Sequence, residues 1–285
     1  LGYNILLEKP MSPNPLETLL IAEEAEKHNV SVTVCHVMRY SPFYVELKRL
    51  VDEGTIGRVV SIHWSENVGY YHQAHSFVRG NWRNSWESSP MILQKCCHDI
   101  DMLHWLIGST CTKVSSFGSL SYFTEENAPE GSTERCTDGC AVEHECPYSA
   151  LKWYYNTIDE WPHNVPAVKK GLDARLRAIQ EGPYGRCVYR CDNDVVDHQV
   201  ANLVFDNGVT VAFTMTGLSA ENKRTFTIHG TQGEIRGDDA KQELEVRLFS
   251  GKRFLITPES LGGGHGGADI GLMKEFVGIA SGRVS

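Results

Sequence analysis

The sequence predicts an α/β protein in which the tail of a doubly wound domain, residues 1–40, precedes an α+β domain with an open, mostly antiparallel sheet, residues 41–285. Three patterns indicate this fold class. Residues 4–37 have the pattern strand, helix, strand, and residues 90–108 have the apolar spacing of a helix. From about residue 196 onward, apolar and polar side chains alternate as they do in half-buried strands. We expect helix 90–108 at the interface of the two domains.

The first domain is predicted from one βαβ unit. The apolar runs Asn4–Leu7 and Val30–Val37 are typical of strands covered on both faces. Between them, Asn14 is placed to cap a helix, Pro15 occupies its first position, and Glu17 is spaced to complete a capping box. A strand buried on both faces needs further parallel neighbours. We therefore expect the sequence to be a fragment that lacks most of the N-terminal half of its first domain.

The second domain is predicted to begin with a helix at Pro42–Glu53 and a strand at Arg58–Val68. The helix at 90–108 ends at a glycine, and the polar stretch Thr124–Cys146 is expected to be a long loop. Five alternating runs, separated by turn residues, predict an antiparallel meander with one face on a core and the other free. These runs are Gln199–Phe205, Val209–Met215, Thr225–His229, Glu243–Phe249 and Arg253–Thr257.

Composition excludes several classes of partner. The net charge is -9 and no dense Lys/Arg stretch occurs, so neither nucleic acid nor an anionic membrane surface is an expected partner. No apolar run reaches the roughly 20 residues of a membrane helix. The nine cysteines are odd in number and include an adjacent pair, Cys96-Cys97, as is typical of a reducing compartment. We expect a cytoplasmic protein.

Five short motifs follow one another along the chain. Glu8-Lys9-Pro10 ends the first strand and Arg39-Tyr40-Ser41-Pro42 ends the second. Asn81-Trp82-Arg83 comes next, then KCCHDID at 95–101 and GTQGEI at 230–235. In this order the motifs resemble the Gfo/Idh/MocA family, the glucose-fructose oxidoreductase and inositol dehydrogenase group, over nearly all of the chain.

The resemblance implies an N-terminal Rossmann domain for NAD or NADP and a C-terminal domain whose open sheet forms a homo-dimer or homo-tetramer. It implies an oxidoreductase that transfers a hydride between NAD(P) and a sugar, inositol or related polyol. Two alternatives stay open: an NAD-dependent glycoside hydrolase of the same family, and a non-catalytic sugar- or nucleotide-sensing protein. The family's glycine-rich phosphate loop would lie upstream of Leu1, so this fragment alone is expected to bind NAD(P) poorly and to be inactive.

The resemblance also implies a set of catalytic residues. Lys9 corresponds to the family's lysine that reaches the nicotinamide ribose and the substrate hydroxyl. The family's Asp and His lie four residues apart on a helix; His98 matches the histidine, but Gln94 stands at the aspartate position. A glutamine can orient a hydroxyl but cannot remove its proton, so the adjacent Lys95 is a candidate replacement. The alternative for His98 is a helix histidine bonded to Asp101.

Further residues are expected to bind the two ligands. A literal G-x-G-x-x-G occurs at residues 262–267, but only about 18 residues follow it, too few for a helix and a second strand. We interpret it as a flexible loop over the sugar, with a solvated turn as the alternative. The predicted substrate-binding residues are Gln94, His98, His265 and Asp269. The predicted cofactor-binding residues are Glu8, Lys9, Pro10, Arg39, Trp82 and Arg83, although for Trp82-Arg83 a packed cation on an aromatic surface is the alternative.

The polar loop contains a cluster of cysteines. Cys136, Cys140, His144 and Cys146 have the spacing C-x3-C-x3-H-x-C, and Cys187 follows later. Thiolates and imidazole can hold zinc tetrahedrally, which makes a structural zinc an alternative at these five residues. The spacing is not one of the standard zinc motifs, so we favour reduced thiols and expect no metal.

Overall fold

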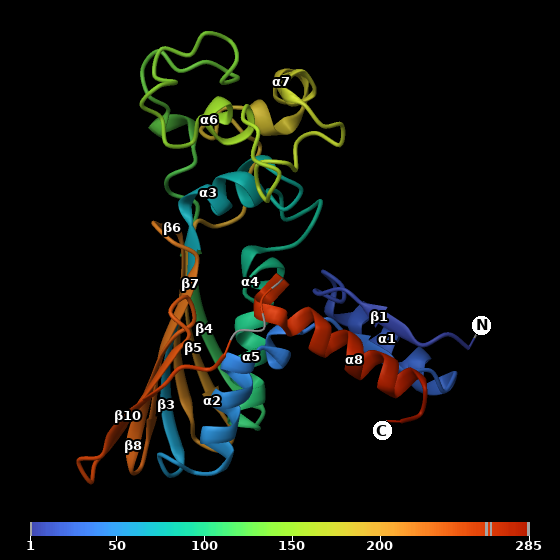
Figure 1. Ribbon diagram of the computed structural model, residues 1–285, viewed down its shortest axis with the longest axis vertical. Coiled ribbons are helices and arrows are strands. Elements are labelled where there is room, and N and C mark those ends of the chain that lie inside the picture. The colour runs from blue at the N-terminus through green and yellow to red at the C-terminus, as the bar shows by residue number, and fades with distance from the viewer. Residues whose placement is uncertain (1, 260–261, 263, 284–285) are drawn as a thin grey trace.

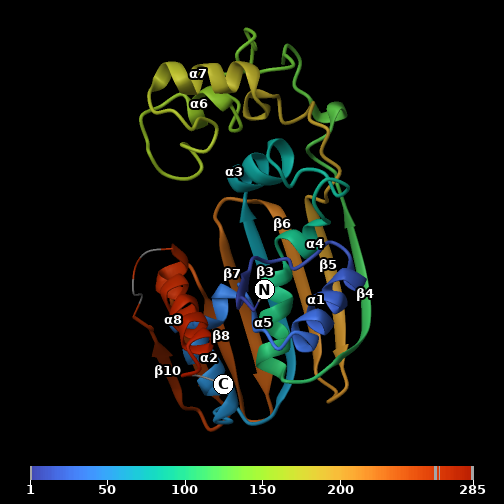
Figure 2. The ribbon, with the colours of Figure 1, turned by 90° about the vertical axis from the view of Figure 1, so that its right-hand side faces the viewer.

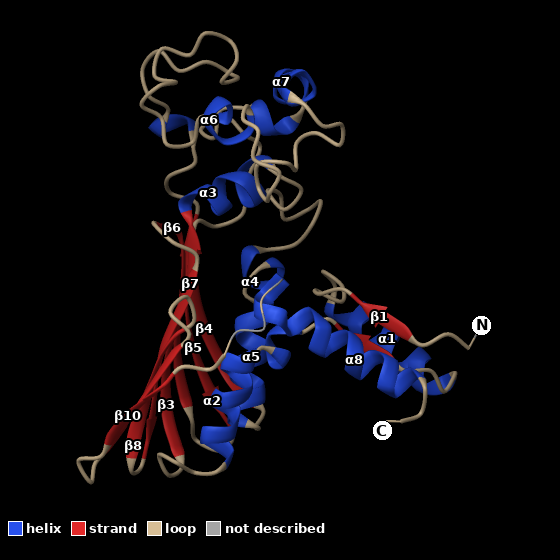
Figure 3. Ribbon diagram, in the orientation of Figure 1, coloured by secondary structure: helices blue, strands red, loops and turns tan. Residues whose placement is uncertain are grey.

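The computed structural model describes residues 2–259, 262 and 264–283. Figures 1 and 3 show an upright sheet with helices against one face, a lobe of loops and short helices above one end of that sheet, and a small unit containing both termini beside it. Within the described residues, no helix has the length and apolarity needed to cross a lipid bilayer.

The N-terminal unit is the predicted βαβ unit. Strands β1 (Ile5–Leu7) and β2 (Val32–Val34) are parallel neighbours, and α1 (Pro15–Lys27) connects them. Asn14 caps α1 as predicted, since its side-chain oxygen accepts from the amide of Leu16 at 3.0 Å. The predicted capping box is wrong in one contact: the amide of Asn14 donates to Ser12 Oγ, and that hydroxyl donates to Glu17.

The predicted two-sided burial of the first strand is also wrong. Ile5 is 44% exposed, and α1 has no buried residue. In the described chain β1 and β2 form a sheet of only two strands. One helix cannot cover both faces of such a sheet, so apolar side chains on β1 and α1 remain in contact with water. The second strand is shorter than predicted, because a 3-10 helix follows at Val37–Tyr40.

The large sheet has the strand order β10-β9-β8-β7-β3-β6-β5-β4. Every neighbouring pair is antiparallel except β3 and β6, which confirms an open, mostly antiparallel sheet. Because β3 lies between β6 and β7, the strands do not form the simple meander that we predicted. The strands are β3 (Val59–Gly69), β4 (Cys111–Ser119), β5 (His198–Phe205), β6 (Thr210–Ser219), β7 (Lys223–Gly230), β8 (Gly233–Asp238), β9 (Glu243–Leu248) and β10 (Arg253–Ile256).

Helices α2 (Pro42–Asp52) and α5 (Cys97–Ile107) cover one face of this sheet, and Figure 2 shows them in front of it. The predicted single helix at 90–108 is wrong, since α4 (Met91–Gln94) and α5 are separated at Lys95 and Cys96. At this break, the carbonyl of Gln94 accepts from Lys9 Nζ at 2.9 Å, a contact from a distant part of the chain. Gly108 ends α5 with φ of 63°, which favours glycine.

The lobe above the sheet is formed mainly by residues 120–196. It contains α6 (Ala150–Tyr154) and α7 (Leu172–Glu181), and the predicted long loop at 124–146 is confirmed except for one 3-10 turn, Glu125–Asn127. Beneath the lobe, β3 continues into α3 (Tyr70–His72) and a π-helix, Gln73–Arg79.

The chain returns to the N-terminal unit at its end. Residues 264–267 form a short segment in which His265 and Gly266 have left-handed backbone angles, and α8 (Ala268–Ala280) follows. Ala268 and Leu272 of α8 pack against Cys35 and Val37, so this helix contributes to the core of the first unit. The domain boundary between residues 40 and 41 stays a prediction. It assigns α8 to the second domain, although α8 packs against residues of the first.

Candidate functional site

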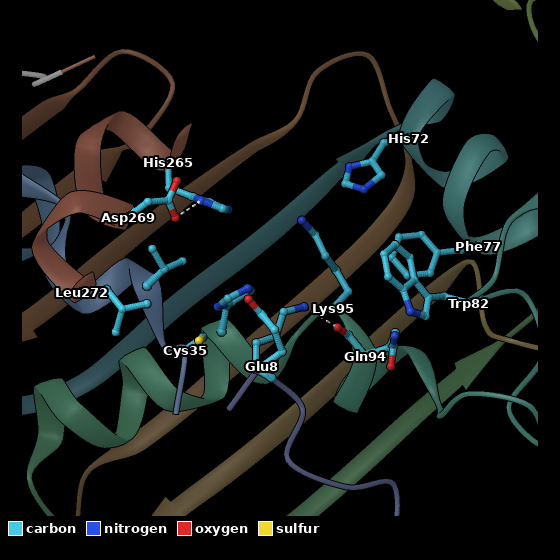
Figure 4. Close-up of a pocket in the computed structure, with 13 residues that line it drawn as sticks. Glu8, Cys35, His72, Phe77, Trp82, Gln94, Lys95, His265, Asp269 and Leu272 are labelled. Atoms are coloured by element: carbon cyan, nitrogen blue, oxygen red, sulfur yellow. Dashed lines mark hydrogen bonds and ion pairs between the residues drawn. The ribbon is translucent and has the colours of Figure 1, made fainter. Parts of the chain in front are cut away.

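A cavity of about 210 Å³ lies where three parts of the fold meet (Figure 4). The end of β1 forms one wall, the segment from His72 to Trp82 forms another, and α4, α5 and α8 provide the rest. Most of the predicted site residues lie around this single cavity. They are Glu8, Lys9, Trp82, Gln94, Lys95, His98, His265 and Asp269.

Lys9 is held at the end of β1 by the broken helix. Its Nζ donates to the carbonyl of Gln94 at 2.9 Å. Burial lowers the pKa of Lys9, and the positive charges of Lys95 and Arg224 lower it further, against the opposing charges of Cys97 and Glu8. A lysine with a lowered pKa holds its proton less tightly and is better suited to accept and release protons near neutral pH.

His98 is buried in the wall of the cavity, with 9% of its surface exposed. Burial, followed by the charges of Lys9 and Arg224, lowers the pKa of His98 to about 2, so the imidazole is neutral. Its Nδ1 is buried and has no hydrogen-bond partner among the described residues. The predicted alternative partner, Asp101, is bound by Arg39 instead, with Nε at 2.8 Å from Oδ2.

Gln94 and Lys95 occupy the break between α4 and α5. The side-chain oxygen of Gln94 accepts from Ser89 Oγ at 2.6 Å, which fixes the amide. Lys95 extends into the cavity, and its Nζ lies 3.5 Å from Oε1 of Glu66 on β3.

A buried ionic network lies on the sheet side of Lys95, and none of the sequence motifs predicts it. Arg224 on β7 contacts three carboxylates: Nη2 lies 2.7 Å from Glu66, Nε lies 2.7 Å from Asp99, and Nη1 lies 3.7 Å from Asp239. Trp64 Nε1 also donates to Asp99 at 2.8 Å. One signal was available, because Glu66 stands in the alternating register of β3 whose other members are buried and apolar, Ile62, Trp64 and Val68.

The opposite side of the cavity comes from the residues around the start of α8. His265 Nδ1 and Asp269 Oδ1 are 3.0 Å apart, and both side chains are about half exposed. His265 has φ of 49°, in the left-handed region that few residues other than glycine adopt. Figure 4 shows this pair across the cavity from Trp82 and Phe77, so the cavity has a polar and an aromatic side.

Three predicted cofactor residues, Pro10, Arg39 and Arg83, are not among the described residues that line the cavity. The guanidinium of Arg39 pairs with Asp101 through two nitrogens. Arg83 binds Asp192 in the same bidentate manner, at 2.8 and 2.9 Å. Both arginines therefore have carboxylate partners within the fold, and their role in cofactor binding stays a prediction.

The cysteine cluster forms a separate, smaller cavity. Cys136, Cys140, Cys146 and Cys187 line about 20 Å³ beside the buried Arg79. His144, the imidazole of the zinc alternative, has a side chain that is 97% exposed and contacts Glu143. In the described part of the chain no three His, Cys, Asp or Glu residues are arranged to hold a metal ion, and no cysteine there is in a disulfide. The zinc alternative is therefore not supported.

Comparison with known proteins identifies the family. Residues 48–254 match the oxidoreductase family's C-terminal alpha/beta domain, which is most of the large sheet and its helices. The chain belongs to the Gfo/Idh/MocA oxidoreductase family. The family assignment made from the motifs is thus confirmed.

Relatives of this family member are oxidoreductases by name. YteT of Bacillus subtilis (strain 168), whose name places it among oxidoreductases, is 27% identical over 96% of this chain and 66% of its own length. Inositol 2-dehydrogenase 4 of Saccharopolyspora erythraea is 31% identical over 47% of this chain and 36% of its own length. A solved levoglucosan dehydrogenase, in complex with NADH and levoglucosan, superposes with a TM-score of 0.65 at 21% identity, covering 100% of this chain and 66% of that one. The chain thus spans just under two thirds of the length of YteT and of the levoglucosan dehydrogenase, and about a third of that of the inositol dehydrogenase.

Proposed function

We propose that this chain forms the substrate side of an oxidoreductase that transfers a hydride between NAD(P) and a sugar, inositol or related polyol. The observation that carries the proposal is the convergence of Lys9, Lys95 and His98 on one cavity. Lys9 follows the end of β1 and is distant in sequence from Lys95, at the helix break, and His98, in α5. The cavity is lined by several polar side chains suited to hydroxyl groups.

The residues around the cavity fit the nicotinamide end of the cofactor. His98 Nδ1 is a buried polar atom without a hydrogen-bond partner in the described chain, which is the state expected of a group that bonds to a ligand. Glu8 and Lys9 at the end of a parallel strand, with Trp82 opposite, would hold that end of NAD(P). Bound NAD(P) would supply the hydride acceptor.

The protein's own residues would handle the proton and orient the alcohol. Lys9, whose pKa is lowered by burial, would bind the reacting hydroxyl and share its proton. Neutral His98 would donate or accept one hydrogen bond to the same hydroxyl without competing for a positive charge. His265 and Asp269 would bind the remaining hydroxyls from the opposite side, and the face of Trp82 would contact the sugar ring.

One alternative has an observation in its favour. Gln94 replaces the acidic residue of the family's helix pair, and its oxygen is already engaged by Ser89, so it cannot act as a base. The fold is also similar to that of Gal80p from Saccharomyces cerevisiae, a protein solved as a super-repressor mutant, with a TM-score of 0.62 at 16% identity over 98% of this chain and 58% of that one. A sensor that binds a sugar or nucleotide without turnover would retain the cavity and lose the base.

The test is turnover of NAD(P) by the full-length protein with a panel of polyols and sugars. Lys9→Met and His98→Ala should each lower kcat by roughly 10²- to 10⁴-fold, because positioned acid–base groups contribute that much, and this loss should be far larger than any change in the affinity for NAD(P). Lys27→Met, on the exposed side of α1, is the matched control and should leave kcat unchanged. Near-normal rates in both cavity variants would reject the assigned roles, and ligand binding without any turnover would favour the sensor.

A further inference from the structure

Lys95 has an unusual environment for a lysine at a sugar site. It stands in the break between α4 and α5 with its side chain mostly buried, and its Nζ lies in the cavity. Seven other titratable side chains of the described residues line the same cavity: Glu8, Lys9, Cys35, His72, His98, His265 and Asp269. On its inner side, Lys95 Nζ lies 3.5 Å from Oε1 of Glu66 on β3.

The charges behind Lys95 do not balance. Glu66, Asp99 and Asp239 are three carboxylates gathered around Arg224, and Lys95 is the second cation in contact with them. Glu66 is only 2% exposed, so water does little to stabilise its charge. If all five groups were charged, the network would carry a net negative charge in a buried place, which favours the uptake of one proton.

Glu66 is the member of the network that is best placed to take that proton. Its Oε1 faces Lys95, while Oε2 forms an ion pair with Arg224 at 2.7 Å but accepts no hydrogen bond from the described residues. Burial, together with the nearby charge of Asp99 and against the charges of Arg224 and Lys95, raises the pKa of Glu66 to about 7. By contrast, Asp99 accepts hydrogen bonds from both Trp64 and Arg224.

We propose that Lys95 and Glu66 act as one proton-accepting pair, in which Glu66 positions Lys95 and accepts one proton from it in the same step as Lys95 accepts the proton of the substrate hydroxyl. The inference rests on the proposed function of the cavity. As the alcohol is oxidised, its O–H bond breaks and a new N–H bond forms on Lys95, while another N–H bond of Lys95 breaks and an O–H bond forms on Glu66. The electron pair of the substrate C–H bond would leave with the hydride to the NAD(P) of the proposed function, and the electron pair of the broken O–H bond forms the carbonyl double bond. Lys95 stays an ammonium throughout, and Glu66 becomes a neutral acid.

The pair explains how a site with Gln94 in place of an acid could still remove a proton. A buried carboxylate at 3.5 Å from the lysine provides the acceptor that Gln94 cannot provide, from a strand rather than from the helix. Lys9 can bind the reacting hydroxyl, but in the described part of the chain its Nζ pairs with the carbonyl of Gln94 and with no buried carboxylate that could take the proton onward. Glu66 touches no substrate itself and is a positioning residue that acts through Lys95.

The first experiment measures the carboxyl group of Glu66 without substrate, by infrared spectroscopy of the full-length protein across pH. The wild type should show one carboxyl group that titrates near pH 7. Glu66→Gln should remove this signal, and Lys95→Met should move it to higher pH, because the cation that favours the carboxylate is lost. Glu46→Gln, which changes an ion pair with Arg49 on α2, is the matched control and should leave the signal in place.

The infrared titrations of the two variants test whether Lys95 and Glu66 are paired. Retention of the signal in Glu66→Gln, or an unchanged titration in Lys95→Met, would overturn the proposal. If Glu66→Gln fails to fold, Lys95→Met still gives the answer, since that side chain can be shortened without opening the buried network.

The second experiment separates the pair from the proposed function. In the wild type, kcat for alcohol oxidation should rise with pH through about 7, as the pair loses its extra proton. Glu66→Gln should lose this rise and lower kcat at pH 8 roughly 10-fold, with KM little changed. An unchanged pH profile would overturn the proton role. If no polyol is oxidised by the wild type, the proposed function fails, whereas the infrared titration still reports whether Lys95 and Glu66 are paired.

Discussion

Two histidines are expected to make this fold sensitive to acid. His75, in the π-helix, and His98, in the cavity wall, are both at least nine-tenths buried. Burial is the main cause that lowers the pKa of His75 to about 4 and that of His98 to about 2, from 6.5 in the unfolded chain. Both rings therefore remain neutral in the folded protein while they bind protons in the unfolded chain below pH 6.5.

The difference in pKa between the folded and unfolded states determines how stability changes with pH. A depressed pKa in the folded state gives stability that is complete above pH 6.5 and is lost as the pH falls toward 4 for His75 and toward 2 for His98. One pH unit corresponds to about 1.4 kcal/mol for each group. At pH 5, each histidine therefore lowers the free energy of unfolding by about 2 kcal/mol relative to pH 8, and the two together lower it by about 4 kcal/mol. That is a large part of the total stability of a typical domain, about 5–15 kcal/mol.

The assay compares the free energy of unfolding in urea at pH 8 and pH 5 for the wild type and for the double variant His75→Gln/His98→Gln. The double variant loses a hydrogen bond between His75 and Tyr154, but this loss affects both pH values equally and cancels in the comparison. The opposite effect of Glu66, whose raised pKa costs stability as pH rises from 4.5 to about 7, is present in both proteins and also cancels.

We expect the wild type to lose about 4 kcal/mol more than the double variant on going from pH 8 to pH 5. His144→Gln, at a fully solvated side chain, is the control and should behave as the wild type. Equal losses in the wild type and in the double variant would show that the two rings are protonated in the folded state, and would refute the reasoning.

Two further predictions concern the large sheet. A Cβ on residue 237 would lie 2.1 Å from the ring of Phe226, which is stacked on Trp64 at 4.6 Å. Gly237→Ala should therefore lower the free energy of unfolding, measured in urea, by about 1–3 kcal/mol, and an unchanged midpoint would contradict this packing. Phe117 and Val200 are paired in register and exposed on the sheet, so we expect self-association there; sedimentation should show a smaller species for Phe117→Lys/Val200→Lys, and a monomeric wild type would refute it.

Local signals were sufficient for most of the fold. The cap at Asn14, the glycine at the end of α5 and the alternation from residue 198 onward depend on neighbouring residues, and the structure contains each of them. The strands β4 and β8 were missed because their sequences resemble loops: β4 is an exposed edge strand rich in serine, and β8 has glycines on both sides of a single apolar residue, Ile235. Their pairing comes from partners elsewhere in the sheet, which no local pattern reports.

The site residues show the same limit. Lys9, Lys95 and His98 were found from motifs, and the structure brings them to one cavity. Arg39 and Arg83 were expected at the cofactor because a motif gives a residue's type but not its partner. Their carboxylates, Asp101 and Asp192, are 62 and 109 residues away in sequence.

The sheet under α4 and α5 explains how the site could function with Gln94 at the position of the family's acid. A helix pair of acid and histidine would place the base on one element, whereas here the helix is broken and the Gln94 carbonyl binds Lys9 instead. The break also turns Lys95 toward the cavity, where the nearest acid, Glu66, comes from β3. Glu66 is held in turn by Arg224 from β7, the strand that pairs with β3. The strands that form the core therefore also determine the charge of the groups that face the cavity, and a substitution at Arg224 should alter the site without touching it.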